Sequence, residues 1–378
     1  MYRGYININK INNINNFNPI NKISINSNTN QNKEIDISLE DIKINDSNNL
    51  ENILLNSIKN KQDIFNNPND KIILKVNKFS KYTLKDLESI KNNEITKKEF
   101  YNVYNSALYN NFYDIYEIIK DNSSTFDYSI QEGKIKNLSY KNGDITFYAN
   151  IKSLDRIIEK MQRKNKNNLG ELTDIVRGRI DCKDVNQALI IYKKIIQNLE
   201  SKNKEINIYK APDGTEKLDI ENMIENPRPD YMGRIHMVIK DKETGAIFEL
   251  QIGSKNITDF IEKPVNINYG TKEQINKNGT ITYIEDTFNS NIHDLCYKVI
   301  NKIIDNPNYN NKYKNLIPKL QTLKEEYINI QKEIFESEKN GTFESKKQQI
   351  QNRINKYVYN LQNTFVNIDK NDIQTLLG

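Results

Sequence analysis

The segment 234–252 constrains the fold most, because it has the pattern of a β-hairpin. Two runs of alternating apolar and polar residues flank a turn at 241–245 that is rich in polar residues and ends in glycine. Alternation places Glu249 and Gln251 on one face of the second strand and the intervening apolar residues on the other. A carboxylate is therefore held on a rigid strand, opposite a face that packs.

Helix and strand patterns alternate upstream of this hairpin. They predict an amphipathic helix, a strand, a helix, a second strand and a helix with Asp184 as its N-cap, over residues 97–119, 144–149, 151–161, 174–181 and 185–199. We therefore expect an α+β or α/β domain at residues 98–305, built as a mixed β-sheet flanked by helices.

The two ends of the chain differ from this central part. Residues 1–50 contain fifteen Asn and predict a disordered tail, and residues 51–97 form an accessory segment with a strand at 71–76 and a helix after Thr83. Residues 311–378 predict a helical hairpin that either packs on the domain or forms a homo-oligomer.

Apolar runs in the sequence are all short. None approaches the roughly 18 apolar residues that a membrane-spanning helix needs, so no membrane partner is expected. The start of the chain lacks the apolar region of a secretory signal, and its polar tail is either an address for non-Sec export or simple low-complexity sequence.

Positive charge is concentrated in residues 151–180. The whole chain has a net charge of +5, whereas these thirty residues contain eight Lys and Arg against four acidic residues, an excess of four. A concentrated positive field that encloses a few acids suits a polyphosphate partner accompanied by a metal ion.

Three cations in this segment share a helical spacing. Lys152, Arg156 and Lys160 stand at i, i+4 and i+8, so a helix beginning near Lys152 carries them on one face. A solvated basic face is the simpler interpretation, but the same helix leads into a strand that carries Arg177 and Arg179. The combination favours a phosphate-binding surface.

Asp174 and Glu249 are isolated carboxylates on two predicted strands. They are the natural pair to hold Mg²⁺, which binds through one or two carboxylates together with phosphate oxygens of the substrate. In a regular strand Asp174 and Arg179 point to opposite faces. If both act in one site, Asp174 must lie at the start of its strand or beside a bulge.

Histidine and cysteine are rare in the chain. His236 begins the hairpin, where it contacts a phosphate or the attacking nucleotide, or else only a backbone partner, and His293 is expected to start a helix that packs the domain. Neither Cys182 nor Cys296 has a second cysteine or a histidine at metal-ligand spacing, so both are read as reduced thiols.

Four short motifs occur in order along these elements. They are Ile151-Lys-Ser-x-x-Arg-Ile-x-x-Lys-Met161, Thr173-Asp-Ile-Val-x-x-Arg-Ile180, Tyr231-x-Gly-x-Ile-His236 and Phe248-Glu-Leu-Gln-Ile252. Their order and spacing resemble the synthetase domain of RelA/SpoT-type (p)ppGpp synthetases. The resemblance covers about residues 98–305 and implies a nucleotidyltransferase-like fold.

The resemblance also implies a reaction and its residues. The family transfers pyrophosphate from ATP to a nucleotide 3′-hydroxyl by in-line attack on the β-phosphorus, which releases AMP and requires Mg²⁺. Asp174 and Glu249 would be the catalytic and metal-binding residues, and Glu249 would also polarise the attacking hydroxyl. The substrate-binding residues would be Lys152, Arg156, Lys160, Arg177, Arg179, Tyr231, His236 and Gln251.

The sequence departs from the family's pattern at three points. Arg156 stands where the family has Ser, Gly253-Ser254 replaces Arg-Thr, and Tyr231-Met232-Gly233 replaces the Gly-Tyr that supplies a guanine-stacking ring. Tyr231 therefore stacks a base from a shifted position, or the acceptor is not guanine. GDP or GTP, an adenosine nucleotide and an RNA 3′ end all stay open as acceptors.

The hydrolase domain of the family's long members is not expected, because it needs histidine ligands and no histidine precedes His236. Three hypotheses follow for the chain. It is an active pyrophosphotransferase that acts in the cytoplasm, either a housekeeping synthetase or a secreted or addiction-type toxin. Alternatively, it is a non-catalytic nucleotide- or protein-binding module of the same fold, or an unrelated interaction protein that works through its C-terminal helices. The pair Asp174 and Glu249 favours the first.

Overall fold

The computed structural model describes residues 79–120, 124–131, 134–211, 214–229, 231–276 and 280–377. The predicted tail at 1–50, most of the accessory segment and its predicted strand at 71–76 lie outside these residues. The helix predicted after Thr83 is confirmed as α3 (Leu84–Lys91), whose first turn Thr83 caps.

A mixed sheet forms the centre of the described chain, as predicted. Its strands follow the order β1-β2-β3-β4-β10-β9-β5, and β8 also pairs with β9. β4 and β10 are parallel, whereas the other neighbouring strands are antiparallel. The bounds are β1 (Ser124–Gln131), β2 (Lys134–Asn142), β3 (Ile145–Ile151), β4 (Val176–Cys182), β5 (Lys204–Ile206), β8 (Ile220–Asn222), β9 (Arg234–Asp241) and β10 (Ile247–Ser254). A small separate hairpin consists of β6 (Ile208–Lys210) and β7 (Glu216–Leu218).

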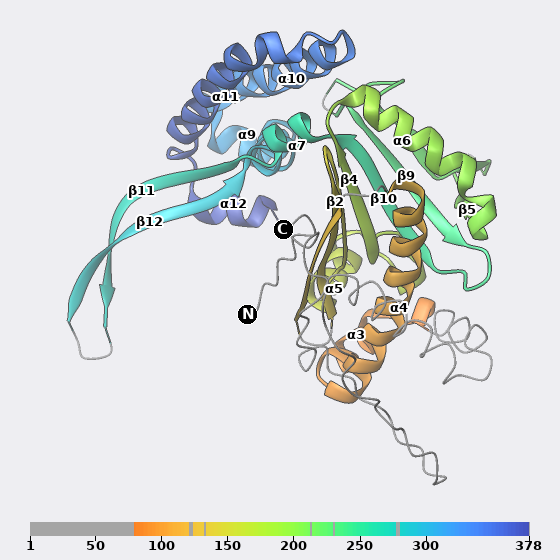
Figure 1. Ribbon diagram of the computed structural model, residues 1–378. Helices are drawn as coiled ribbons and strands as arrows, with labels where there is room; N and C mark the ends of the chain where they lie inside the picture. The colour runs from red at the N-terminus through yellow and green to blue at the C-terminus, as the bar shows by residue number, and fades with distance from the viewer. Residues whose placement is uncertain are drawn as a thin grey trace, which may run out of the picture.

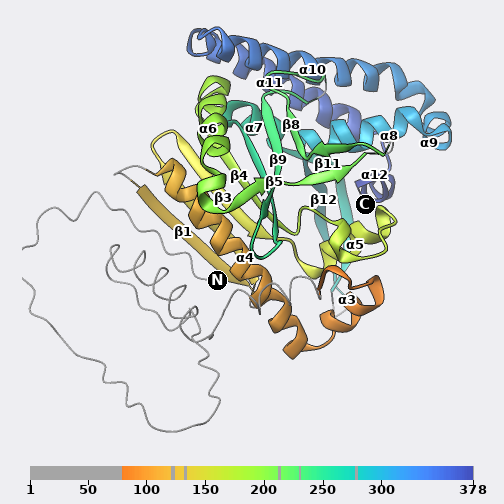
Figure 2. The same ribbon diagram turned by 90° about the vertical axis from the view of Figure 1, so that its right-hand side faces the viewer.

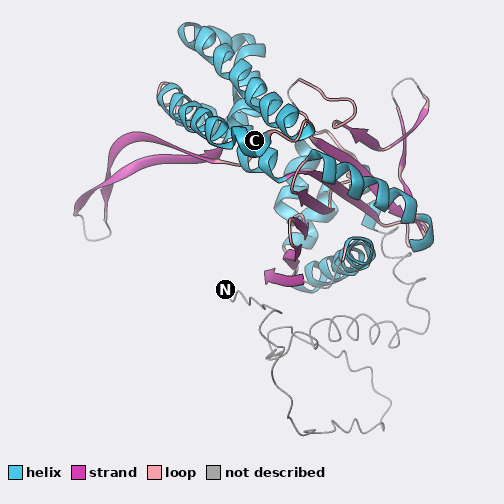
Figure 3. Cartoon of the chain, turned by 45° about the horizontal axis from the view of Figure 1, so that its top comes forward, coloured by secondary structure: helices cyan, strands magenta, loops and turns pink. Residues whose placement is uncertain are grey.

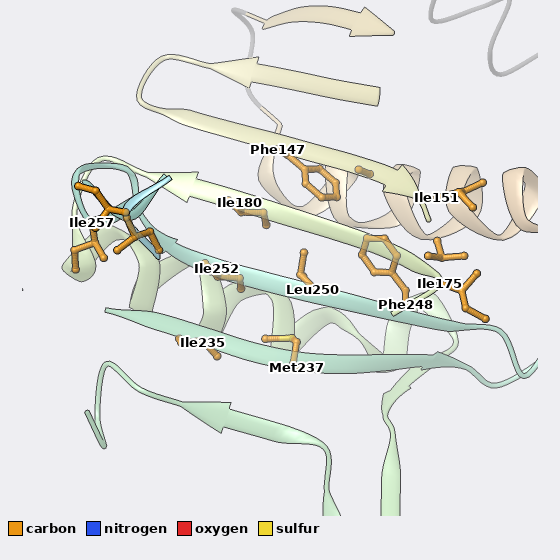
Figure 4. Packing of buried hydrophobic residues seen from close by; sticks show 14 of the residues in the cluster. Phe147, Ile151, Ile175, Ile180, Ile235, Met237, Phe248, Leu250, Ile252 and Ile257 are labelled. Atoms are coloured by element: carbon orange, nitrogen blue, oxygen red, sulfur yellow. The ribbon is translucent and has the colours of Figure 1, made fainter. Parts of the chain in front are cut away.

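Two helices cover one face of the sheet, α4 (Glu94–Ile119) and α6 (Val185–Asn198) (Figure 2). Apolar side chains from the central strands point toward them (Figure 4). Phe112 of α4 stacks on Phe147 of β3 at 4.5 Å between ring centroids. Gly178 makes room for this packing, because a Cβ there would lie 2.5 Å from Phe248 and 2.8 Å from Phe147. Burial of this kind stabilises the fold by about 25 cal/mol for each Å² of apolar surface.

The predicted hairpin is confirmed as β9 and β10, and its alternation is as expected, with the apolar residues of β10 buried between half-buried polar ones. The helix expected at 151–161 instead begins later, as α5 (Leu154–Arg163). Ser153 is its N-cap and accepts a hydrogen bond from the Arg156 amide. Lys152 therefore precedes the helix, and its own amide donates to the Ile175 carbonyl at 2.9 Å.

The C-terminal helical hairpin is confirmed as α10 (Ile317–Lys339) and α11 (Phe343–Phe365). It packs on the domain, since its buried residues belong to the same apolar cluster as the sheet, and α10 contacts both α6 and α7 (Lys255–Ile261). A π-helical segment and two short helices precede the hairpin in the chain, and His293 lies directly before the π-helical segment. The last described helix is α12. Their bounds are Asp294–Ile300, α8 (Asn301–Asp305), α9 (Pro307–Lys312) and α12 (Lys370–Leu377).

A long two-stranded ribbon was not predicted from the sequence. It consists of β11 (Pro264–Ile275) and β12 (Ile281–Asn291), and it projects away from the rest of the molecule (Figures 1 and 3). Polar and apolar residues mix along both strands without a buried face at the outer end, so they lack the alternation that identifies a strand. Among the described helices, none has the length and apolar character needed to cross a membrane.

Candidate active site

The strand register collects charged and polar side chains on the sheet face that α4 and α6 leave uncovered. Arg177 and Arg179 of β4 pair with Glu249 and Gln251 of β10. Gln251 pairs in turn with His236 of β9. Paired residues on neighbouring strands point to the same side of a sheet, so these five predicted site residues share one polar face.

Asp174 lies two residues before Val176, the first residue of β4, so it stands at the entry to its strand, one of the two positions that the sequence allowed. Its carboxylate is buried, and Oδ2 accepts hydrogen bonds from Lys152 Nζ at 2.6 Å and Lys160 Nζ at 2.5 Å. Oδ1 is buried without a hydrogen-bond partner. Burial raises the pKa of Asp174, but the bonds from the two lysines outweigh it and hold the pKa below its usual value.

The cluster of Lys152, Lys160 and Asp174 carries more positive than negative charge. Burial lowers the pKa of Lys152, and repulsion from Lys160 and Arg177 acts in the same direction, although Asp174 opposes both. A further anion would relieve this repulsion. A phosphate group is the kind of anion that two ammonium groups and a guanidinium bind well.

Arg156 does not join this cluster. It pairs with Glu159 on the same helix at 2.7 Å, and its side chain is 66% exposed. The expected alignment of three cations therefore holds for the two lysines only, because the helix begins after Lys152 and turns Arg156 outward. The side chain of Arg177 is exposed, and its Nε donates a hydrogen bond to Asn150 Oδ1 at 2.8 Å.

A second charged cluster lies further along β4, around Arg179. Arg179 forms ion pairs with Asp181 and with Glu262, the C-cap residue of α7, and its guanidinium lies 5.2 Å from the centre of the Tyr148 ring. Burial raises the pKa of Asp181, although Arg179 and Arg234 oppose the effect.

Arg234 is buried and connects this cluster to the hairpin. Its Nη2 donates to Thr258 Oγ1 at 2.9 Å, and its Nη1 lies 3.3 Å from the Tyr231 hydroxyl and 3.4 Å from Gln251 Oε1. Arg234 is also the register partner of Gly253. A Cβ at position 253 would lie 2.7 Å from Arg234 Cγ. The close approach of Arg234 therefore requires glycine at position 253, one of the positions at which the sequence departs from the family's pattern.

Aromatic rings gather beside Arg234. The Tyr231 ring makes edge contacts with His236 at 5.3 Å and His293 at 5.9 Å, and Arg228 lies 5.8 Å from its centre. Gly233, with a φ of +73°, sets the turn that follows Tyr231. Burial, together with the charges of Arg234 and Arg228, lowers the pKa of His236 to about 4, so this imidazole is neutral at physiological pH.

Glu249 and Asp174 lie at different positions along the direction of the strands. Its Oε1 accepts a hydrogen bond from Gln251 Nε2 at 3.0 Å. Asp174 precedes Arg177, the register partner of Glu249, by three residues, which is about 10 Å along a strand at roughly 3.3 Å per residue. The two carboxylates share an ion only if their side chains converge, so the shared site stays a prediction.

A magnesium site here would depend on the substrate for most of its ligands. In the described part of the chain, no three His, Cys, Asp or Glu side chains gather closely enough to bind a metal by themselves. Mg²⁺ commonly takes one or two carboxylates and completes its shell with phosphate oxygens and water. The unpartnered Oδ1 of Asp174 fits such a role, with Glu249 as the second carboxylate.

The sequence reasoning missed four residues of the site. Three are on the sheet, Tyr148, Asp181 and Arg234, and the fourth is Glu262, which follows α7. Asp181 could have been predicted from the sequence, because it lies on the same side of its strand as Arg177 and Arg179. Glu262 carries no such signal, since its part in the site depends on α7 folding back toward β4.

The fold and the polar face define a class of protein. A mixed sheet with helices on one face and basic and acidic side chains on the other is suited to phosphate transfer, in which positioned charge does most of the work. Residues 149–276 match the family model described as "Region found in RelA / SpoT proteins". This part of the chain is therefore a RelA/SpoT-type region, as the motifs suggested, and it contains all ten predicted site residues.

The matched segment is 128 of the 378 residues and runs from β3 to the end of the β11 strand. No match was found among curated proteins or among solved structures.

Proposed function

We propose that this chain is an ATP pyrophosphotransferase that moves the β,γ-pyrophosphate of ATP to the 3′-hydroxyl of a nucleotide acceptor. The observation that carries the proposal is the cluster of Lys152, Lys160 and Asp174 at the start of β4, inside the RelA/SpoT-type region. Its surplus positive charge and its unpartnered carboxylate oxygen suit a metal-bound polyphosphate.

In the proposed reaction, Lys152 and Lys160 bind the phosphates of ATP, and Arg177 and Arg179 of the same polar face stabilise the charge that develops on the transferred group. The acceptor 3′-oxygen attacks the β-phosphorus as the bond from that phosphorus to the α,β-bridging oxygen breaks. AMP leaves with the bridging oxygen. Glu249 accepts the proton of the attacking hydroxyl.

Asp174 and Glu249 are also the residues proposed to hold Mg²⁺. When bound, the ion would neutralise charge on the phosphate oxygens. Asp174 has a second task that needs no metal, because it fixes the two lysines at their positions through Oδ2. Loss of Asp174 would therefore disorganise the phosphate-binding groups as well as the metal site.

The acceptor is proposed to lie near Tyr231 and His236. Tyr231 offers a ring for stacking on a base, and the neutral His236 has a buried Nε2 without a hydrogen-bond partner. A neutral imidazole nitrogen can donate to or accept from a base or a sugar hydroxyl. These contacts suit a nucleoside but do not select among guanine and adenine nucleotides or an RNA 3′ end.

The test is AMP release from labelled ATP in the presence of Mg²⁺, with GDP, GTP, adenosine nucleotides and RNA offered separately as acceptors. We expect AMP to appear with at least one acceptor and to disappear in Lys160→Met. Lys347→Met, at an exposed site on α11, is the matched control. ATP binding without AMP release for any acceptor would instead indicate a nucleotide-binding module of the same fold.

A further inference from the structure

Glu338 is a buried carboxylate that the C-terminal hairpin supplies to the RelA/SpoT-type region. It lies at the end of α10, with a relative exposure of 2%. Its Oε1 accepts hydrogen bonds from Ser254 Oγ at 2.6 Å and Asn256 Nδ2 at 2.7 Å. Its Oε2 accepts one from the Val185 amide at 3.1 Å. All three donors belong to the matched region, and Glu338 does not.

These three donors mark the starts of two helices. Val185 is the first residue of α6, and Ser254 is the N-cap of α7, where its hydroxyl oxygen accepts from the amides of Asn256 and Ile257. The hydroxyl hydrogen of Ser254 is donated to Glu338. The carboxylate therefore fixes the rotamer of the side chain that begins α7, in addition to capping α6.

The short helix α7 is tied to the polar face at two points. Thr258 accepts the hydrogen bond from Arg234, and its hydroxyl lies 3.2 Å from Asp181 Oδ1. Glu262, the C-cap residue of the helix, forms the ion pair with Arg179. A shift of α7 would move the partners of both arginines together.

The donors around Glu338 match a carboxylate. Three donors converge on its two oxygens, so an amide in its place would turn an NH₂ group toward a donor. Burial raises the pKa of Glu338 to about 7, and the hydrogen bonds from Ser254 and Asn256 and from the Val185 amide oppose that rise. A buried group with this many partners is costly to replace even when the substitution keeps its size.

We propose that Glu338 is a positioning residue through which the C-terminal hairpin holds α7, and with it Arg179 and Arg234, in place on the polar face. The expected effect on kcat rests on the proposed function, whereas the expected effect on the position of α7 does not. This role of Glu338 makes the hairpin a working part of the site, although the hairpin lies outside the matched region.

Two variants test the proposal, Glu338→Gln and Ser254→Ala, with Arg353→Ala as the matched control. Arg353 bridges Glu326 and Glu333 within the hairpin, so its loss weakens the hairpin without touching α7. Each protein is compared at the same interval below its own midpoint of thermal unfolding. The readouts are amide exchange of residues 255–262, and kcat and KM for ATP.

We expect Glu338→Gln and Ser254→Ala each to speed exchange in α7 and to lower kcat about tenfold or more, because small displacements of positioning groups are costly. KM for ATP should stay close to wild type, since Lys152 and Lys160 lie at the other end of β4. The double variant should be no worse than the worse single one. Arg353→Ala should leave α7 exchange and kcat near wild type.

The proposal is overturned if both variants keep wild-type exchange in α7, or if Arg353→Ala changes exchange and kcat as much as they do. A wild-type protein that releases no AMP would count against the proposed function alone. In that case the exchange measurement decides the positioning role: faster exchange than in Arg353→Ala supports it, and equal exchange refutes it.

Discussion

Replacing Asp174 with asparagine should destabilise the fold as well as the site. The substitution keeps the size of the side chain and removes the one negative charge between Lys152 and Lys160. The side chains are 11% exposed for Asp174, 12% for Lys152 and 24% for Lys160. Removing one partner from a buried ion pair costs about 3–5 kcal/mol. Because both lysines retain some access to water, we expect the lower end, about 3 kcal/mol.

A loss of about 3 kcal/mol is a large part of the 5–15 kcal/mol that typically separates folded from unfolded protein. Urea unfolding at pH 7 measures it as a lower midpoint with an unchanged slope. Asp155→Asn is the matched control on the neighbouring helix. Asp155 also pairs with a lysine, Lys91, but the two side chains are 67% and 48% exposed, and exposed pairs contribute about 0–1 kcal/mol.

The same comparison has a defined pH dependence. The folded-state pKa of Asp174 is lowered, so its stabilising contribution is fully present above the unfolded-state pKa of about 3.9. It is lost as the pH falls through the folded-state pKa. The stability gap between wild type and Asp174→Asn should therefore be constant from pH 7 to pH 5 and narrow below pH 4. The reasoning is refuted if Asp174→Asn is as stable at pH 7 as Asp155→Asn.

Three further predictions concern single residues. Glu249→Gln should lower the rate of AMP release by on the order of 10²–10³ while ATP binding survives; a variant with wild-type AMP release would remove Glu249 from the mechanism. His236 has a folded-state pKa near 4, so its contribution to stability is present above about pH 6.5 and is lost as the pH falls toward 4; an NMR titration of its ring with a midpoint above 6 would contradict this. Gly178→Ala should destabilise by about 1–3 kcal/mol, because its Cβ would meet the rings of Phe147 and Phe248; chemical unfolding with an unchanged midpoint would show that the rings can move aside.

Much of the fold was predictable because its central elements obey local rules. The β9–β10 hairpin has a strict alternation around a polar turn, and α6 has both its apolar stripe and the N-cap Asp184. The β11–β12 ribbon gave no such signal, since most of its outer residues face solvent on both sides. The three-residue difference at the start of α5 has a local cause, because Ser153 rather than a residue before Lys152 caps the helix.

The site was predictable where it lies within one strand or in register between strands. Asp174 was expected at the start of its strand or beside a bulge, and Glu249 and Gln251 were expected on one face. The bonds from Lys152 and Lys160 to one oxygen of Asp174 could not be foreseen, because they depend on how α5 packs at the end of the sheet. The role of Glu338 could not be foreseen either, because it depends on contacts between segments about eighty residues or more apart in the sequence.

The central claim is that ATP gives up its β- and γ-phosphates as one unit to the acceptor. The most direct measurement follows two labels in parallel, one in the γ-phosphate and one in the α-phosphate of ATP, with the acceptor that supports turnover. The account predicts that the γ-label appears on the acceptor and the α-label appears in AMP, and that both products are lost in Asp174→Asn. Transfer of the α-label to the acceptor, or release of the γ-label only as free phosphate, would contradict it.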